Sequence, residues 1–120
     1  LQLEPPLNVK IALYRILQES LNNIIKYAKP KEVFVQLKID AEYVDLYIKD
    51  DGVGFEQANV LPSQMGLKIM RERAREVQLD IDIQSELGSG TQIKVQGLMT
   101  KQQQRRSTIN VSPNSTYSRR

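Results

Sequence analysis

The residues best suited to bind a ligand stand together in one stretch, Asp50-Asp51-Gly52-Val53-Gly54-Phe55. The preceding residues 43–49 alternate between aliphatic and polar types, which is typical of a half-buried strand. Asp50 lies an even number of positions from these aliphatic residues, so its carboxylate points to the same, buried side of the strand. An unpaired charge there would cost on the order of several kcal/mol, so Asp50 needs a partner. Glycine permits positive φ and the close approach of another group. The stretch is a candidate wall of a ligand site, or else an ordinary turn, because Asp and Gly are common in turns.

A long helix is predicted before this stretch, from a cap at Asn8 to about Ala28. Its apolar residues recur at helical spacing and form a core stripe, Leu13, Leu17, Leu21, Ile24 and Ala28. Four polar residues lie close together on the roughly opposite side, Glu19, Asn22, Asn23 and Lys26. A solvated face is the ordinary interpretation, but adjacent asparagines are mediocre helix formers in mid-helix. Their presence there indicates that the amides have a function.

The remaining pattern predicts four strands and a second helix. Alternation marks strands at residues 33–39, 43–49, 79–84 and 91–96, the first two forming a hairpin. The second helix starts near Gly66 and buries Leu67, Met70, Ala74 and Val77. Residues 56–64 have no period and are expected to form a mobile loop. This order predicts an α/β (α+β) two-layer sandwich, with helices on one face of a mixed, largely antiparallel sheet.

The composition is that of one soluble domain with a basic tail. The chain has 120 residues and a net charge of +3. The last twenty residues contain five of the 17 basic residues and no acidic ones, which leaves 12 basic against 14 acidic residues before them. A folded nucleic-acid-binding surface is therefore not expected. We predict a lead-in at residues 1–7, a domain at 8–98 and a disordered tail at 99–120.

Two residue types are missing altogether. Cysteine is absent, which excludes disulfides and thiol catalysis and suits a cytoplasmic domain. Histidine is also absent, which excludes histidine-ligated metals, a histidine general base and a phosphohistidine on this chain. No apolar run approaches 18 residues, so no membrane span is expected from the sequence.

Four motifs, in order and on their predicted elements, resemble the ATP-binding catalytic domain of bacterial two-component sensor histidine kinases. They are an N box at Glu19–Ala28 and glycine boxes at Asp50–Phe55, Gly66–Arg73 and Gly88–Thr91. This family is part of the gyrase, chaperone, histidine kinase and mismatch-repair ATPase superfamily. The resemblance covers residues 8–97 and implies a Bergerat-type ATP-binding fold. The second glycine box is most similar to the subfamily whose response regulators carry helix-turn-helix domains.

The resemblance implies two cofactors, ATP and Mg²⁺, and assigns the phosphate end of the site to the first helix. Asn23 would hold Mg²⁺ through its amide oxygen, a ligand that suits this hard ion. Glu19 would be the catalytic acidic residue that orients or polarises the attacking group. Lys26 would lie near the phosphates, and Asn22 is the alternative residue to share or take over the work assigned to Asn23. The amides from Gly66 onward would meet the phosphates at a helix N-terminus.

The base end is assigned to the glycine boxes. Asp50 would accept a hydrogen bond from the adenine amino group, which supplies the partner that its inward parity requires. Gly52 and Gly54 would let the base lie against the backbone, and Thr91 would support Asp50 and the adenine edge. The expected nucleotide contacts also include Val53, Met65, Leu67 and Gly90. Residues 56–65 would form the lid.

The sequence departs from the family pattern in two places. Met65-Gly66 replaces a paired Gly-x-Gly, which leaves fewer flexible points in the lid, and Tyr27 stands where many relatives have histidine. The resemblance further implies phosphoryl transfer to a histidine on an upstream helical dimerisation and phosphoacceptor domain, in cis or in trans. A response regulator would be the next partner. The full-length protein would be a homodimer, either membrane-anchored or soluble, and the isolated domain would be a monomer.

Other functions remain open from the sequence. A serine kinase of the same superfamily, acting on anti-anti-sigma proteins, would share these motifs. Chaperones, gyrases and mismatch-repair proteins need a longer lid and a transducer domain, which 120 residues do not accommodate. A non-catalytic module that binds nucleotide, or nothing, is a different class, against which the intact Glu19, Asn23 and Asp50 argue. The basic tail could also be an arm for nucleic acid or a membrane surface, although its arginines are sparse.

Overall fold

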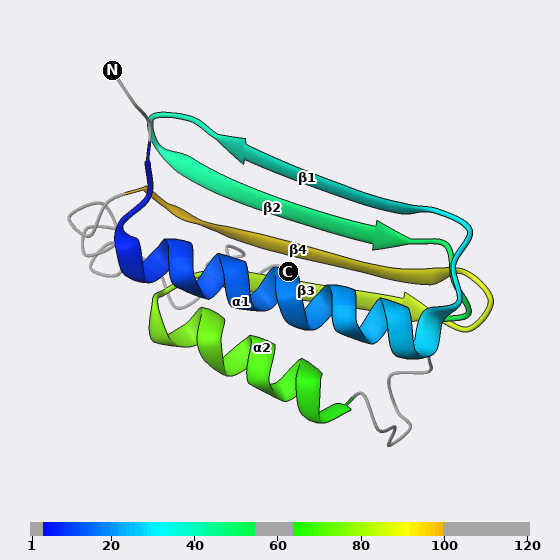
Figure 1. Cartoon of the computed structure of the whole chain (residues 1–120). Coiled ribbons are helices and arrows are strands. Elements are labelled where there is room, and N and C mark those ends of the chain that lie inside the picture. Colours follow the sequence, from blue (N-terminus) through cyan, green and yellow to red (C-terminus); the bar gives the residue numbers. More distant parts are fainter. Residues whose placement is uncertain (1–3, 55–63, 100–120) are drawn as a thin grey trace, which may run out of the picture.

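The computed structural model describes residues 4–54 and 64–99, which fold into a helical layer packed on one face of a sheet (Figure 1). The elements in chain order are α1 (Leu7–Asn23), the π-helical η1 (Ile24–Ala28), β1 (Val33–Ile39), β2 (Tyr43–Asp50), α2 (Gln64–Glu76), β3 (Asp80–Glu86) and β4 (Gly90–Leu98). This is the two-layer α+β sandwich that the sequence predicts. Within the described residues, no helix combines the length and apolar character needed to cross a membrane.

The four strands form one sheet in the order β1-β2-β4-β3. Every pairing among them is antiparallel, and the predicted hairpin is confirmed as β1 against β2. The register places Asp50 opposite Val33 on β1 and opposite Thr91 on β4. The first and third glycine boxes therefore meet at the same end of the sheet.

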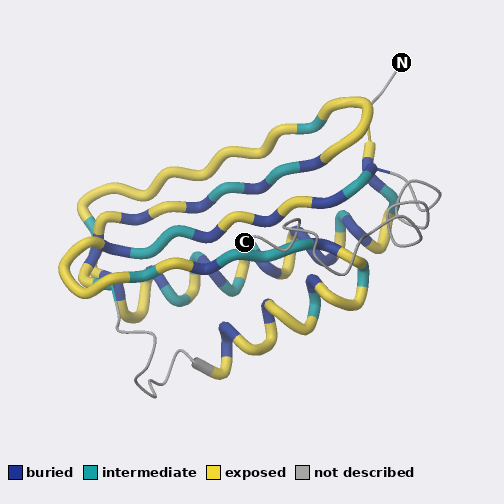
Figure 2. Tube along the Cα trace, turned by 180° about the vertical axis from the view of Figure 1, so that it is seen from behind, coloured by how far each residue is buried: buried dark blue, intermediate teal, exposed yellow. Residues whose placement is uncertain are grey.

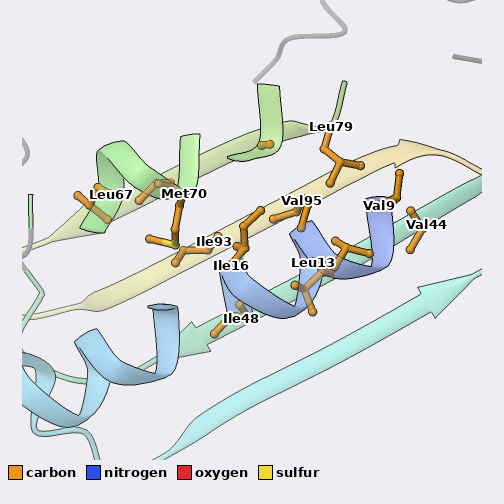
Figure 3. Close-up of a cluster of buried hydrophobic side chains, with 14 of the residues drawn as sticks. Val9, Leu13, Ile16, Val44, Ile48, Leu67, Met70, Leu79, Ile93 and Val95 are labelled. Carbon is orange, nitrogen blue, oxygen red and sulfur yellow. The ribbon is translucent and has the colours of Figure 1, made fainter. Parts of the chain in front are cut away.

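The core lies between the sheet and the two helices (Figure 3). Its largest fully buried apolar side chains come from both layers: Val9, Ile16, Val44, Ile48, Met70 and Val95. Burial alternates along β2 and along much of β4, as expected for strands with one face on the core, whereas β1 at the sheet edge is exposed along most of its length (Figure 2). Ser20 also lies in the core, where its hydroxyl donates to the Ile16 carbonyl oxygen and contacts the Met70 sulfur of α2.

The first helix differs from its prediction at both ends. It begins at Leu7, and its flanking residue is Pro6, whose carbonyl oxygen accepts from the Val9 and Lys10 amides. Asn8 is not the cap; its side-chain oxygen accepts from Val9 N within the first turn. The helix ends at Ala28 as predicted, but its last five residues are a π-helix that closes with Lys29 at a φ of 47°. An apolar repeat of 3.6 residues predicts an α-helix and does not reveal the wider turns of a π-helix.

Several boundaries shift by one or two residues. β2 includes Asp50, β3 starts at Asp80 and continues to Glu86, and β4 runs from Gly90 to Leu98. Helix α2 begins at Gln64, so most of the predicted loop and lid lies outside the described residues. The predicted tail also lies outside them, apart from Met99, which is buried in the core and donates its amide to the Glu42 carbonyl oxygen.

Candidate functional site

Asp50 is the only acidic residue among those described that is almost fully buried, with 3% of its surface exposed. It ends β2 on the face that buries Val44, Leu46 and Ile48, as its parity predicts. Its Oδ1 accepts from the Gly52 amide at 2.8 Å. Loss of hydration raises the pKa of Asp50 above its ordinary value. Hydrogen bonds from the Gly52 and Thr91 amides lower the pKa less strongly, and the neighbouring Asp51 charge adds a smaller increase. A buried carboxylate that is held by backbone amides can serve as a fixed hydrogen-bond acceptor.

The backbone after Asp50 passes between two other segments at very short range. A Cβ atom added to Gly52 would lie under 3.0 Å from the Ala28 carbonyl oxygen at the end of η1, and Val53 N donates to that oxygen at 2.8 Å. On the other side, Gly88 N donates to the Val53 carbonyl oxygen at 2.7 Å. Gly52 is therefore required for close approach, as expected for a glycine box.

An open cavity of about 440 Å³ borders Asp50 where β2 and β3 end and β4 begins. Such a volume is within the range of small-molecule sites. Its lining residues are Lys49, Asp50, Gln84, Ser85, Glu86, Ser89, Gly90, Thr91 and Gln92. Three of the predicted site residues, Asp50, Gly90 and Thr91, are thus brought together.

Ser85 is a lining residue that the sequence analysis did not identify. Its Oγ lies 2.7 Å from Thr91 Oγ1 and donates to the Gly90 carbonyl oxygen at 3.2 Å. The signal was available, because Ser85 continues the inward parity of Ile81 and Ile83 as a polar residue. It was missed because the predicted strand ended at Gln84.

A second cluster, outside this cavity, brings the first helix to the start of α2. A Cβ atom added at Gly66 would lie 3.2 Å from Asn23 Nδ2 and under 3.0 Å from the Glu19 carboxylate. Glu19 and Asn23, one turn apart, therefore both reach the first turn of α2. The N box and the second glycine box are thus in contact.

The other predicted site residues are placed less closely. Asn22 and Lys26 are exposed, Val53 is 49% exposed and Met65 is 65% exposed. Gly54 is the exception: it has a φ of 66°, and a Cβ atom added there would lie under 3.0 Å from the carbonyl oxygen of Glu86, which lines the cavity. Leu67 packs its side chain in the core, so only its backbone could reach a ligand. Phe55 and most of the predicted lid, residues 56–63, lie outside the described residues.

The donor atoms near Gly66 suit a magnesium ion. Glu19 offers a carboxylate and Asn23 an amide, and oxygen is the ligand that Mg²⁺ prefers. No group of three His, Cys, Asp or Glu side chains that could hold a metal was found in residues 4–54 and 64–99. Mg²⁺ usually keeps several waters and binds phosphate oxygens, so one or two protein oxygens are enough to hold it.

Fold and site together define a class of protein: a two-layer α+β domain in which two glycine turns meet at one end of an antiparallel sheet and the start of the second helix packs on the first. Residues 8–101 match the family described as histidine kinase-, DNA gyrase B- and HSP90-like ATPase. The chain belongs to this family.

The relatives of this chain include sensor histidine kinases. The chain is 41% identical over 93 residues to an uncharacterized sensor-like histidine kinase of Chloroflexus aurantiacus, covering 72% of this chain and 16% of that protein. It is 35% identical over 97 residues to the sensor protein VraS of Staphylococcus saprophyticus, covering 81% and 28%. The chain therefore spans less than a third of the length of either relative.

A solved structure shares the fold. The histidine kinase domain of the Erythrobacter litoralis EL346 blue-light activated histidine kinase superposes with a TM-score of 0.63 at 20% identity, covering 83% of this chain and 48% of that one. Together with the sequence matches, this confirms the resemblance: the chain is homologous to the ATPase domain of sensor histidine kinases.

Proposed function

We propose that this domain binds Mg-ATP and donates the γ-phosphoryl group to a histidine on a separate helical domain, as the catalytic part of a sensor histidine kinase in two-component signalling. The observation that carries the proposal is the buried carboxylate of Asp50, a residue that borders a 440 Å³ cavity at the end of β2. Buried carboxylates are rare unless paired, and the adenine amino group is a matching donor.

The base end of the site supports selection of adenine. Asp50 accepts from an amino group and repels a carbonyl oxygen, so it favours adenine over guanine. Gly52 lets the backbone after Asp50 pack tightly on η1. Gly90 and Thr91 bring the opposite strand to the same cavity, and the Thr91 hydroxyl is held by Ser85. These residues bind and orient the base.

The phosphate end is built from Glu19, Asn23 and the first turn of α2. Asn23 would hold the metal with phosphate oxygens, and Lys26 and the amides after Gly66 would lie near the phosphates. When bound, the metal supplies charge neutralisation on the phosphates. Glu19 would orient or polarise the attacking imidazole, while the domain holds the nucleotide in line with it.

The acceptor and the other partners must come from outside these residues. The sequence contains no histidine, so the phosphoacceptor belongs to another domain or chain. The relatives are named as sensor kinases and are several times longer than the match. We expect a helical dimerisation domain as the direct partner, a response regulator as the next, a cytoplasmic location for the domain and a homodimeric full-length protein.

Calorimetric titration with ATP and GTP, in the presence of Mg²⁺, tests the proposal. We expect ATP to bind more tightly than GTP, and Asp50→Ala to weaken ATP binding by about 1–3 kcal/mol, as for a lost hydrogen bond to a charged group. Asp45→Ala, on the outward face of the same strand, is a control that should leave ATP affinity unchanged. Equal affinity for ATP and GTP would contradict the role of Asp50, and absence of ATP binding would contradict the function.

A further inference from the structure

Asp51 links the first glycine box, by hydrogen bonds, to the loop that follows the first helix. Its Oδ1 accepts from the Lys31 amide at 2.8 Å and from the Glu32 amide at 2.9 Å. Its own amide donates to the Glu32 carbonyl oxygen at 3.3 Å. These hydrogen bonds, with the nearby Lys31 charge, hold the pKa of Asp51 below its ordinary value, which means that the ionised carboxylate is the form engaged.

The attachment is completed two residues later. Val53 N donates to the Ala28 carbonyl oxygen at the end of η1, and Gly52 packs against the same carbonyl. Residues 51–53 are therefore hydrogen-bonded both to the end of the helix and to the loop that follows it. The helix carries Glu19 and Asn23, whereas residues 51–53 continue directly from Asp50.

The two clusters of the candidate site are otherwise separate. Asp50 and Thr91 line the cavity, while Glu19 and Asn23 lie outside it, against Gly66. A single nucleotide that uses both must find them at a fixed separation. Core packing between the first helix and β2 contributes to this separation, and near Asp50 hydrogen bonds made by Asp51 and Val53 also hold it.

We propose that Asp51 is a positioning residue: by joining the end of β2 to the loop after η1, it sets the distance between the base-binding and phosphate-binding parts of the site. This role rests on the nucleotide function proposed above. Asp51 acts through Asp50 and the helix and does not itself touch the ligand. Its loss should therefore weaken ligands that span both parts far more than ligands that occupy one.

The hairpin provides a matched control at its other end. Asp40 Oδ1 accepts from the Glu42 and Tyr43 amides, each at 2.8 Å, in the turn between β1 and β2. Asp40 is thus a second exposed carboxylate that caps two consecutive amides on the same pair of strands. It lies at the opposite end of β2 from Asp50, so removing it should affect stability but not the site.

The experiment compares Asp51→Ala, Asp51→Asn and Asp40→Ala in the whole chain, with ATP and with adenosine as ligands. We expect Asp51→Ala to weaken ATP binding about tenfold or more and adenosine binding less than about threefold. Asp51→Asn keeps an oxygen for both amides and should remain within about threefold of wild type for ATP. Asp40→Ala should lower the melting temperature as Asp51→Ala does, with ATP affinity unchanged.

A second measurement requires no variant. Amide hydrogen exchange of Lys31 and Glu32 in the wild-type chain should slow on addition of ATP but little with adenosine, while Glu42 and Tyr43 do not respond. If Asp51→Ala bound ATP as wild type does, or if adenosine lost as much affinity as ATP, the positioning role would be wrong while the nucleotide function stood. If wild type bound no ATP, the proposed function and this role would both be overturned.

Discussion

Gly88, in the turn before β4, and Gly90, the first residue of β4, allow the steric demands of the site to be measured separately from backbone strain. Gly88 has a φ of 85° and Gly90 a φ of 90°, so an alanine at either position is held in the left-handed region. That conformation costs an L-residue about 1–2 kcal/mol. An added Cβ at Gly88 meets nothing within 4 Å, whereas at Gly90 it falls under 3.0 Å from the Asp50 carbonyl oxygen.

The difference between the two substitutions therefore reports the contact with Asp50. We expect Gly88→Ala to lower the free energy of unfolding by about 1–2 kcal/mol, from strain alone. Gly90→Ala should lose a further ~1–3 kcal/mol, because a backbone oxygen cannot move aside as a flexible side chain can. The displaced Asp50 backbone should also weaken ATP binding, by about tenfold, which corresponds to roughly 1.4 kcal/mol.

Urea denaturation and calorimetric ATP titration of both variants provide the measurements. Gly88→Ala should bind ATP as wild type does, because the added methyl group projects into open space. Equal losses of stability in the two variants would show that the packing between the third glycine box and Asp50 is looser than described. Unchanged ATP affinity in Gly90→Ala, despite its lower stability, would show that the position of Asp50 does not govern nucleotide binding.

Three further predictions concern single side chains. Burial raises the pKa of Asp50, so the folded state binds the proton of the Asp50 carboxyl group more tightly than the unfolded state does. The stability that this protonation contributes is present below pH 3.8 and is lost as pH rises through the pKa of the folded state. Urea denaturation between about pH 3 and 7 should accordingly show Asp50→Asn gaining stability relative to wild type as pH rises; a constant difference would contradict the raised pKa. Asn23→Ala should remove most of the effect of Mg²⁺ on ATP affinity in calorimetry, and Asn22→Ala less, whereas the reverse order would move the metal ligand by one residue. With labelled ATP, the chain alone should take up no acid-labile phosphate. Once a helical phosphoacceptor domain is supplied, Glu19→Ala should slow phosphoryl transfer by about 10²–10⁴-fold with little loss of ATP affinity. Equal losses of transfer rate and ATP affinity would assign Glu19 to ground-state binding.

Local patterns were sufficient for the elements and for one end of the site. The period of two in residues 43–49 placed Asp50 on the buried face, and the register with β4 then set it opposite Thr91. The hairpin and the buried face of the second helix also followed from periodicity, because burial of an apolar stripe is decided within each element. The stripe predicted for the first helix was only partly right: Leu17 and Leu21 are half-buried. Its fully buried residues include several that were not predicted: Val9, Ala12, Ile16 and Ser20. The roles within the site came from the resemblance to a family and stay predictions here.

The packing between distant segments was decided only by the tertiary structure. Nothing in the sequence around residues 24–28 distinguishes a π-helix from an α-helix, yet the Ala28 carbonyl oxygen it presents is the acceptor for Val53 N. The approach of Glu19 to Gly66, and of Asp51 to the Lys31 and Glu32 amides, joins residues 19 to 47 positions apart. Periodicity reports which side of an element is buried; which residue it meets there depends on the sheet order β1-β2-β4-β3 and on how the two helices lie across it.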